Sequence, residues 1–158
     1  MNHAVLYVRD ARRTARFYQG VLNFRMVVES PDGAYAFLRA NDSNNHHDIA
    51  FFSVGSSAGD PTPPATVGLY HLAWEVPTLA DLDEVRVRLE DAGALVGSSD
   101  HGVNKSLYAK DPDGLEFEVM WLTPPELWGD QEHQAIIRPL DLDAERATYG
   151  DHRTAAGR

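Results

Sequence analysis

The sequence contains no cysteine, which excludes disulfide bonds and thiolate chemistry. Any metal ion that the protein holds must therefore be bound by histidine and carboxylate side chains. Basic residues are also scarce, with 14 Lys and Arg against 24 Asp and Glu, and the formal net charge of -10 argues against a nucleic-acid partner. Apolar runs are short, and none approaches the roughly 20 residues of a membrane-spanning helix.

The first residues lack the basic and apolar stretches of a signal peptide, and we expect a cytoplasmic protein. With 158 residues, of which 43% are hydrophobic, the chain has the size of one globular domain with its own core. We place that domain at residues 1–122. Residues 123–158 are mostly polar. We expect this C-terminal extension to form a lid or short helix or to reach a partner subunit, with its last ten residues disordered.

The first part of the domain predicts a strand, a helix and three further strands. Asp10 is placed to cap a helix over 11–22, and Asn23 suits its C-terminus because asparagine tolerates a left-handed backbone. The strands are predicted at about 3–8, 25–29, 35–40 and 47–54. Residues 55–66 then have the composition of a linker.

The same order of elements begins again after the linker. Thr78 is placed to cap a second helix, which carries an apolar stripe and ends at Gly93. The strands are predicted at about 70–76, 94–98, 106–110 and 115–122, the last one after the turn Asp111-Pro-Asp-Gly. His71 opens its strand as His3 opens the first one, 68 positions earlier. The sequence therefore predicts an α+β fold of two βαβββ modules, at about 1–54 and 68–122, whose sheets curl into one cup.

Alternation along three strands separates an apolar face from an opposite face that carries an ionisable side chain in each strand. The apolar face should pack under the helices. The predicted core consists of Leu6, Leu72, Trp74, Phe117, Val119, Phe17, Leu82, Val85 and Leu89. The opposite faces carry His3, His71 and Glu118, which converge on the floor of the predicted cup. Two imidazoles and one carboxylate with open positions form the facial triad that suits Fe(II) and other divalent first-row metals.

The chain resembles the vicinal oxygen chelate superfamily, which includes glyoxalase I, bleomycin-resistance proteins, fosfomycin-resistance enzymes and extradiol dioxygenases. The resemblance covers residues 2 to about 122. It is carried by the two strand-opening histidines, by Phe17-Tyr-Gln-Gly-Val-Leu-Asn-Phe24, and by the turn Asp-Pro-Asp-Gly with Glu118 after it. Asn23 stands where glycine is usual in the family. The resemblance implies a homodimer or larger homo-oligomer.

Two further motifs are similar to those of the extradiol dioxygenases. Asp100-His101-Gly-Val-Asn-Lys-Ser-Leu-Tyr108 resembles the stretch that supplies a histidine and a tyrosine to the pocket wall in that branch. Asn45-His46-His47-Asp48-Ile-Ala-Phe resembles its His-His-x-x-Ala stretch, whose second histidine acts as acid and base. That resemblance selects His47. Strict alternation from Ala50 selects His46 instead, unless a bulge precedes the strand.

The resemblance to this branch implies ring cleavage of a small catechol-type compound with dioxygen. Fe(II), or Mn(II) or another divalent metal, is held by the triad. The resemblance further implies that in this reaction His47 moves a substrate proton, Tyr108 hydrogen-bonds a substrate oxygen and His101 stabilises bound oxygen. Glyoxalase I has a fourth ligand where this chain has Ala50. Two alternatives remain: a metal-dependent lyase, isomerase or transferase, and a metal-free protein that sequesters a small molecule.

Overall fold

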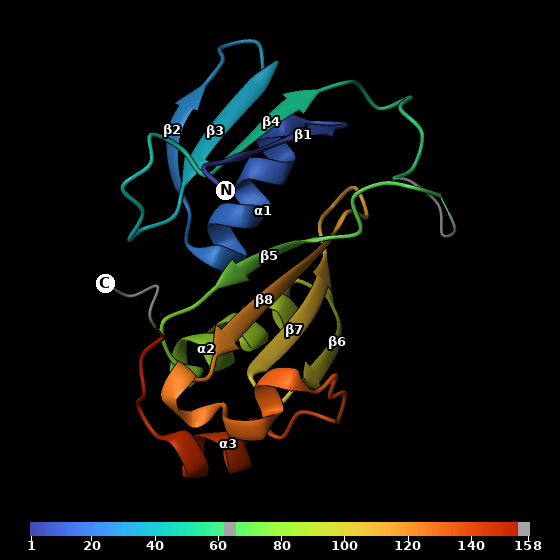
Figure 1. The fold of residues 1–158 in the computed structure, drawn as a ribbon. Helices are drawn as coiled ribbons and strands as arrows, with labels where there is room; N and C mark the ends of the chain where they lie inside the picture. Colours follow the sequence, from blue (N-terminus) through green and yellow to red (C-terminus); the bar gives the residue numbers. More distant parts are fainter. Residues whose placement is uncertain (62–65, 155–158) are drawn as a thin grey trace. The chain divides into compact units, whose positions relative to one another are not determined.

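A computed structural model describes residues 1–61 and 66–154, and it divides into two compact units. Unit 1 comprises Met1–Gly68 and Asp111–Leu115, and unit 2 comprises Leu69–Lys110 and Glu116–Arg158. The predicted linker, residues 55–66, contains no helix or strand where it is described, and residues 62–65 lie outside the described part of the chain. Figure 1 shows the order of the elements in each unit.

Unit 1 contains a four-stranded mixed sheet with the strand order β1-β4-β3-β2. Strands β1 and β4 are parallel, and the other two pairs are antiparallel. The elements are β1 (Ala4–Val8), α1 (Ala11–Leu22), β2 (Arg25–Glu29), β3 (Tyr35–Arg39) and β4 (Ile49–Ser53). These bounds agree closely with the predicted ones, except that β4 begins two residues later than predicted.

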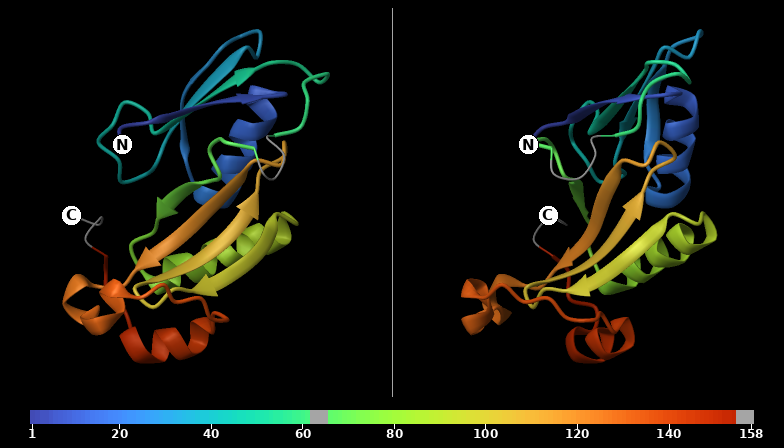
Figure 2. Two further views of the ribbon diagram at one scale, coloured as in Figure 1. Left: turned by 45° about the vertical axis from the view of Figure 1, so that its right-hand side comes forward. Right: turned by 90° about the vertical axis from the view of Figure 1, so that its right-hand side faces the viewer.

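Both predicted ends of α1 are confirmed. The Asp10 carboxylate accepts a hydrogen bond from the Arg13 N–H at 3.1 Å, which satisfies one of the free N–H groups of the first turn. At the other end Asn23 adopts the left-handed conformation, with a φ of 60°. The buried face of α1 carries Tyr18, whose ring lies 5.1 Å from that of Phe51 on β4. The helix therefore covers one face of the sheet, as Figure 2 shows.

Unit 2 repeats this arrangement with the strand order β5-β8-β7-β6. Its elements are β5 (Leu72–Glu75), α2 (Leu79–Asp91), β6 (Leu95–Asp100), β7 (Asn104–Lys110) and β8 (Glu116–Leu122). The second strand of each unit also carries a register shift, at Met26/Val28 in β2 and at Leu95/Gly97 in β6. The predicted repeat of two βαβββ modules is thus confirmed.

The core of unit 2 lies between α2 and the sheet. Leu82 and Leu89 are fully buried on the helix, and Phe117 and Val119 are buried on β8. Burial is less complete at four predicted core positions, namely Leu6, Phe17, Leu72 and Trp74, which are half-buried. Three of these four lie on β1 and β5, which are edge strands with a neighbour on one side only.

The C-terminal extension contains two short 3-10 helices and α3 (Leu142–Tyr149) and forms part of unit 2. It is drawn from orange to red in Figure 1. The Trp121 indole donates to the His152 carbonyl at 3.2 Å, and the Thr154 N–H donates to the Pro77 carbonyl at 2.9 Å. Of the last ten residues, 149–154 thus make defined contacts, and 155–158 lie outside the described residues. No described helix has the length and apolar character that a membrane span requires.

Candidate functional site

In unit 1, a chain of hydrogen bonds orients His3. The Asn2 amide oxygen lies 2.8 Å from His3 Nδ1, and because an amide oxygen only accepts, Nδ1 carries the proton. The Asn2 side chain in turn donates to Asn45 Oδ1 at 2.9 Å, and Asn45 donates to Asp48 at 2.7 Å. His3 Nε2 is left with its lone pair, which is the form of histidine that binds a metal ion.

The loop before β4 decides which of the two neighbouring histidines lies beside His3. The carboxylate of Asp48 is buried and accepts hydrogen bonds from the Ala40 N–H and the Ser43 hydroxyl at 2.9 and 2.8 Å. Residues 45–48 are therefore irregular, and the alternation of β4 does not extend back to them. The rings of His47 and His3 lie 4.5 Å apart, whereas His46 is exposed. His47 is thus the histidine that packs on His3.

His47 has the electrostatic surroundings of a base. Burial lowers its pKa, and the neighbouring His3 and His46 lower it further because they disfavour a second positive charge. The Nδ1 atoms of His46 and His47 lie 3.1 Å apart, so Nε2 of His47 remains available. An imidazole with a lowered pKa is neutral at pH 7 and can accept a proton.

Aromatic side chains extend from His47 over the face of the unit 1 sheet that α1 does not cover. The Phe37 ring lies 5.0 Å from the His47 ring, and the Phe52 ring lies 6.0 Å from that of Phe37. Tyr35 packs on both phenylalanines, at 5.5 and 5.9 Å. The register pairs Tyr7 with Phe52, and the Tyr7 side chain is exposed. This face suits a planar apolar ligand.

In unit 2, His71 and Glu118 come together. His71 Nε2 lies 3.1 Å from Glu118 Oε2, and the Glu118 side chain is buried, with 9% of its surface exposed. The second nitrogen, His71 Nδ1, is buried and has no hydrogen-bond partner among the residues that the structure describes. Two ligands bound at right angles, each about 2.1 Å from one metal ion, would be roughly 3 Å apart. The spacing of this pair therefore fits a divalent metal.

Tyr108 and His101 lie on the same side of the unit 2 sheet. Tyr108 is directly opposite Glu118 in the pairing of β7 with β8, and its ring lies 6.0 Å from that of His71. Burial raises the pKa of Tyr108, and the negative charge of Glu118 raises it further, so the phenol keeps its proton at pH 7. The Tyr108 hydroxyl lies 2.8 Å from His101 Nε2.

Each unit thus brings together the predicted site residues that it contains. His3 and His47 meet in unit 1, and His71, Glu118, Tyr108 and His101 meet in unit 2. Within either unit, the described residues include no group of three or more His, Asp or Glu side chains that could hold a metal ion. The triad of His3, His71 and Glu118 takes ligands from both units, and it stays a prediction.

The sequence analysis did not identify the groups that orient these side chains. Asn2 and Asn45 hold His3, Asp48 shapes the loop of His47, and the Ile136 carbonyl lies 2.8 Å from His101 Nδ1. The resemblance covered the neighbours Asn45 and Asp48 but gave them no role. No sequence pattern pointed to Ile136, because any residue supplies a backbone carbonyl.

The repeated βαβββ unit, with ionisable side chains on the face that each helix leaves open, is the architecture of the vicinal oxygen chelate fold. Residues 1–119 match the model of the Glyoxalase/Bleomycin resistance protein/Dioxygenase superfamily. The chain belongs to this superfamily. A glyoxylase/bleomycin resistance protein/dioxygenase domain from Frankia sp. EAN1pec has a similar fold, with a TM-score of 0.64, 24% identity and coverage of 77% of this chain and 90% of that one.

The curated relatives include proteins named as dioxygenases. Biphenyl-2,3-diol 1,2-dioxygenase 3 of Rhodococcus globerulus is 35% identical over 134 residues, which is 83% of this chain and 68% of that protein. An iron-dependent extradiol dioxygenase of Rhodococcus jostii (strain RHA1) is 31% identical over 133 residues, which is 75% of this chain and 41% of that protein. The chain therefore spans well under the full length of both relatives.

Proposed function

We propose that this protein is an Fe(II)-dependent extradiol dioxygenase that cleaves the ring of a catechol-type compound. The pairing of His71 with Glu118 on the open face of the unit 2 sheet carries the proposal, because an imidazole nitrogen and a carboxylate oxygen 3.1 Å apart suit one divalent metal. Two relatives named as dioxygenases, one of a biphenyl diol and one iron-dependent, support the choice of reaction.

His3, His71 and Glu118 would hold the metal in this proposal. His3 is already in the Nδ1–H form that leaves Nε2 for a metal. Fe(II) bound there supplies coordination for the two diol oxygens and dioxygen and the electron transfer that ring cleavage needs. Three ligands leave those positions open. Ala50, where a fourth ligand would stand in a glyoxalase, has no donor atom and is fully buried.

The protein side chains have separate tasks in this reaction. His47 Nε2 takes a proton from a hydroxyl of the diol, since burial and His3 lower the pKa of His47 and keep it neutral. Tyr108 Oη hydrogen-bonds a substrate oxygen. The resemblance implied that His101 stabilises bound oxygen, but its Nε2 lies 2.8 Å from the Tyr108 hydroxyl, and we therefore propose that it acts through Tyr108. The aromatic face of Phe37, Phe52 and Tyr35 would receive the apolar part of the substrate.

Oxygen uptake by the iron-loaded protein tests the proposal. Protein purified without oxygen is loaded with Fe(II) and mixed with a panel of one-ring and two-ring catechols, while oxygen consumption and the yellow ring-opened product are followed. We expect uptake with at least one catechol and none with Glu118→Ala. Wild-type protein with stoichiometric iron that consumes no oxygen across the panel would refute ring cleavage. Turnover without oxygen in the presence of Mn(II) or Ni(II) would instead identify a lyase or isomerase.

A further inference from the structure

Part of the C-terminal extension lies against the end of β6, next to His101. Asp100 and Arg138 form an antiparallel bridge in which each backbone N–H donates to the carbonyl of the other residue at 2.9 Å. The Arg138 guanidinium also pairs with Asp100 Oδ2 at 2.8 Å. Ile136, two residues before this bridge, is thereby brought to the ring of His101, with its carbonyl oxygen 2.8 Å from Nδ1.

Gly102 allows the extension to come this close. Its φ of +79° is a conformation that L side chains rarely adopt, and a Cβ built there would lie 2.5 Å from Gln131 Oε1 and 2.8 Å from Ile136 Cδ1. A side chain at this position would be strained by the positive φ, and the ends of the Gln131 and Ile136 side chains would have to shift to make room for it. Glycine at position 102 thus leaves room for residues 131–136 to lie close to this loop.

A buried ion cluster holds the same loop to α3. The Lys105 ammonium is 2% exposed and donates to Asp100 Oδ1 at 2.6 Å and to the Gly102 carbonyl at 3.1 Å. It also pairs with Glu145 of α3 at 3.0 Å. A buried charge needs all of its partners, so loss of one would be costly. Lys105 therefore links Glu145 of the extension to Asp100 and Gly102, the two neighbours of His101 in the sequence.

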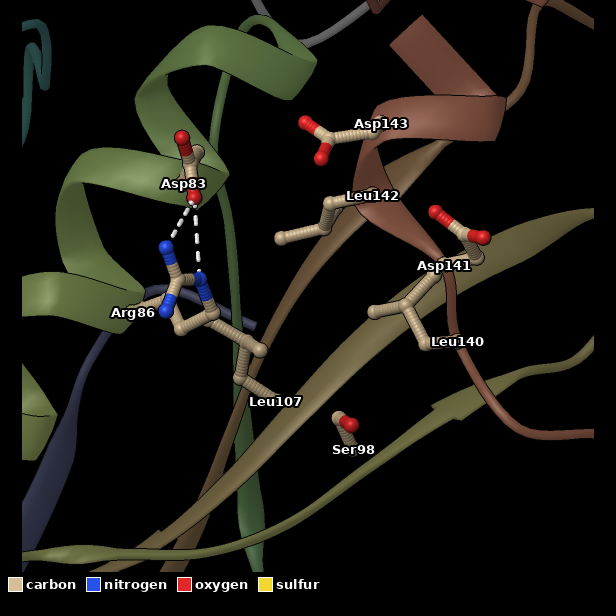
Figure 3. A pocket seen from close by; sticks show the side chains of 8 residues that line it. All are labelled: Asp83, Arg86, Ser98, Leu107, Leu140, Asp141, Leu142 and Asp143. Atoms are coloured by element: carbon tan, nitrogen blue, oxygen red, sulfur yellow. Dashed lines mark hydrogen bonds and ion pairs between the residues drawn. The ribbon is translucent and has the colours of Figure 1, made fainter.

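The helix α3 also lies beside α2. A pocket of about 380 Å³ lies between α2, the sheet and the start of α3. Figure 3 shows Leu107, Leu140 and Leu142 among the side chains that line it. Asp83, at its edge, is already paired with Arg86 at 2.7 Å and with Arg146 at 3.3 Å. Beside His101 itself, the extension is held by its contacts with Asp100 and Lys105.

For the neutral ring of His101, the two hydrogen bonds have only one consistent direction. A carbonyl oxygen accepts and never donates, so the contact with Ile136 requires the proton of the neutral imidazole to be on Nδ1. Nε2 then carries a lone pair, and its contact with Tyr108 requires the hydroxyl to donate. We propose that the extension is a positioning element, in which the Ile136 carbonyl selects the Nδ1–H tautomer of His101 and thereby orients the hydroxyl of Tyr108.

This orientation determines what Tyr108 recognises. With its proton given to His101, Tyr108 Oη offers lone pairs to a ligand and accepts a hydrogen bond from a ligand hydroxyl. A diol that keeps a hydroxyl proton satisfies this acceptor, whereas an ether oxygen at the same place does not. This consequence rests on the proposed function, but the tautomer of His101 is a property of unit 2 alone.

Nitrogen-15 NMR of the 158-residue chain, labelled at histidine and free of metal, tests the tautomer directly. At a pH where His101 is neutral, a protonated and a bare ring nitrogen differ widely in chemical shift. We expect His101 in the Nδ1–H form, although histidine in water favours Nε2–H. We also expect it to stay in the Nδ1–H form in Tyr108→Phe, where the Ile136 bond alone remains. An Nε2–H ring in either protein would overturn the proposal.

A pair of substitutions at Arg138 tests the extension itself. Arg138→Pro removes the N–H that bonds Asp100, whereas Arg138→Ala keeps it, and both lose the guanidinium. We expect a shift toward Nε2–H in Arg138→Pro only. Hydrogen exchange at the Asp100 amide shows whether the bridge has opened. An open bridge with an unchanged Nδ1–H ring would refute the role of the extension.

Kinetics then connect the tautomer to the proposed reaction. If the protein cleaves catechols, Arg138→Pro should lower kcat roughly tenfold to a hundredfold with iron still bound, as is usual for loss of a group that orients a site residue. Arg138→Ala should retain the wild-type kcat. If the two variants have different tautomers of His101 but equal kcat values, the proposed effect of the tautomer on Tyr108 is wrong. A protein without ring-cleaving activity would refute the proposed function and leave the NMR result intact.

Discussion

At the scale of single residues, the two predicted histidine ligands are held in different ways. His3 donates from Nδ1 to Asn2, so its ring has a fixed tautomer and a fixed orientation. His71 has no such partner at Nδ1 among the described residues, and its Nε2 contacts Glu118 at 3.1 Å. Partners of this kind orient metal ligands and raise their basicity. The ring of His71 should therefore depend more on Glu118 and on a bound metal than the ring of His3 does.

The first prediction concerns Tyr108. Tyr108→Phe removes one hydroxyl and should leave iron bound, because Tyr108 is not a predicted ligand. Loss of one positioned hydrogen bond to a reacting oxygen lowers rates by roughly tenfold to a thousandfold. Oxygen uptake measures the rate, and metal analysis measures the iron. Tyr149→Phe deletes the same hydroxyl from the C-terminal extension and should keep the wild-type rate. A Tyr108→Phe protein as fast as wild type would remove Tyr108 from the site.

At the scale of elements, α2 is the simplest test of the packing. Leu82 is fully buried beneath the helix, against the sheet. Truncation to alanine deletes buried methyl groups and leaves a cavity, which costs about 2–5 kcal/mol of the free energy of unfolding. Val87, on the same helix, is 44% exposed, and Val87→Ala should change stability by only about 0.5 kcal/mol or less. Urea unfolding of the two variants measures both values. Equal effects would show that α2 is not docked as described.

The turn before β8 contains a carboxyl group with an unusual pKa. Asp111 accepts hydrogen bonds from the N–H groups of Asp113 and Leu115 at 2.8 and 2.9 Å through Oδ1. Its Oδ2 is buried and unpaired within the described residues. Burial outweighs the two N–H bonds and raises the pKa of Asp111 to about 6. Above that pH the buried carboxyl group of Asp111 is ionised, and its ionisation lowers the stability of the fold.

A pH series on Asp111→Asn measures this cost. The carboxyl group has a pKa of about 3.9 in the unfolded chain and about 6 in the folded one. Its contribution to stability is complete below pH 4 and is lost as the pH rises through 6. Relative to wild type, Asp111→Asn should therefore gain up to about 3 kcal/mol between pH 4 and pH 7.

Asp32 provides a control of opposite sign for this series. The backbone N–H of Ala34 bonds its carboxylate and lowers the pKa of Asp32. Asp32→Asn should consequently lose stability relative to wild type as the pH rises through the acid range. A difference between Asp111→Asn and wild type that is the same at every pH would contradict the raised pKa of Asp111.

At the scale of the whole molecule, the predicted triad would tie metal binding to the folding of both units, because His3 belongs to unit 1 and the other two ligands belong to unit 2. A metal ion at 100 times its Kd should add about 2.7 kcal/mol to the free energy of unfolding. Thermal melts with and without Mn(II), under anaerobic conditions, detect this as a rise in Tm. His3→Ala and Glu118→Ala should each abolish the rise, and His133→Ala, in the exposed part of the extension, should retain it. A full rise in His3→Ala would show that the metal site does not include unit 1.

Much of this fold was predictable because its signals are local. The cap of Asp10, the left-handed Asn23 and the alternation of Phe117 and Val119 depend on neighbours along the chain, and all three are confirmed. Because the sequence repeats, the order of elements in the second unit could be predicted from the first. The boundary of β4 was less predictable, since Asp48 draws hydrogen bonds from residues up to eight positions away and so ends the alternation.

The sequence by itself determined the two βαβββ units and the superfamily, because these follow from the period of the alternation, the spacing of the repeat and the motifs. Only the tertiary structure decided that His47, rather than His46, packs on His3, since an irregular loop cancels strand alternation. The same holds for the bond from Ile136 to His101. A backbone carbonyl has no signature in a sequence, and its role arises only when the chain folds back to within 2.8 Å of the ring.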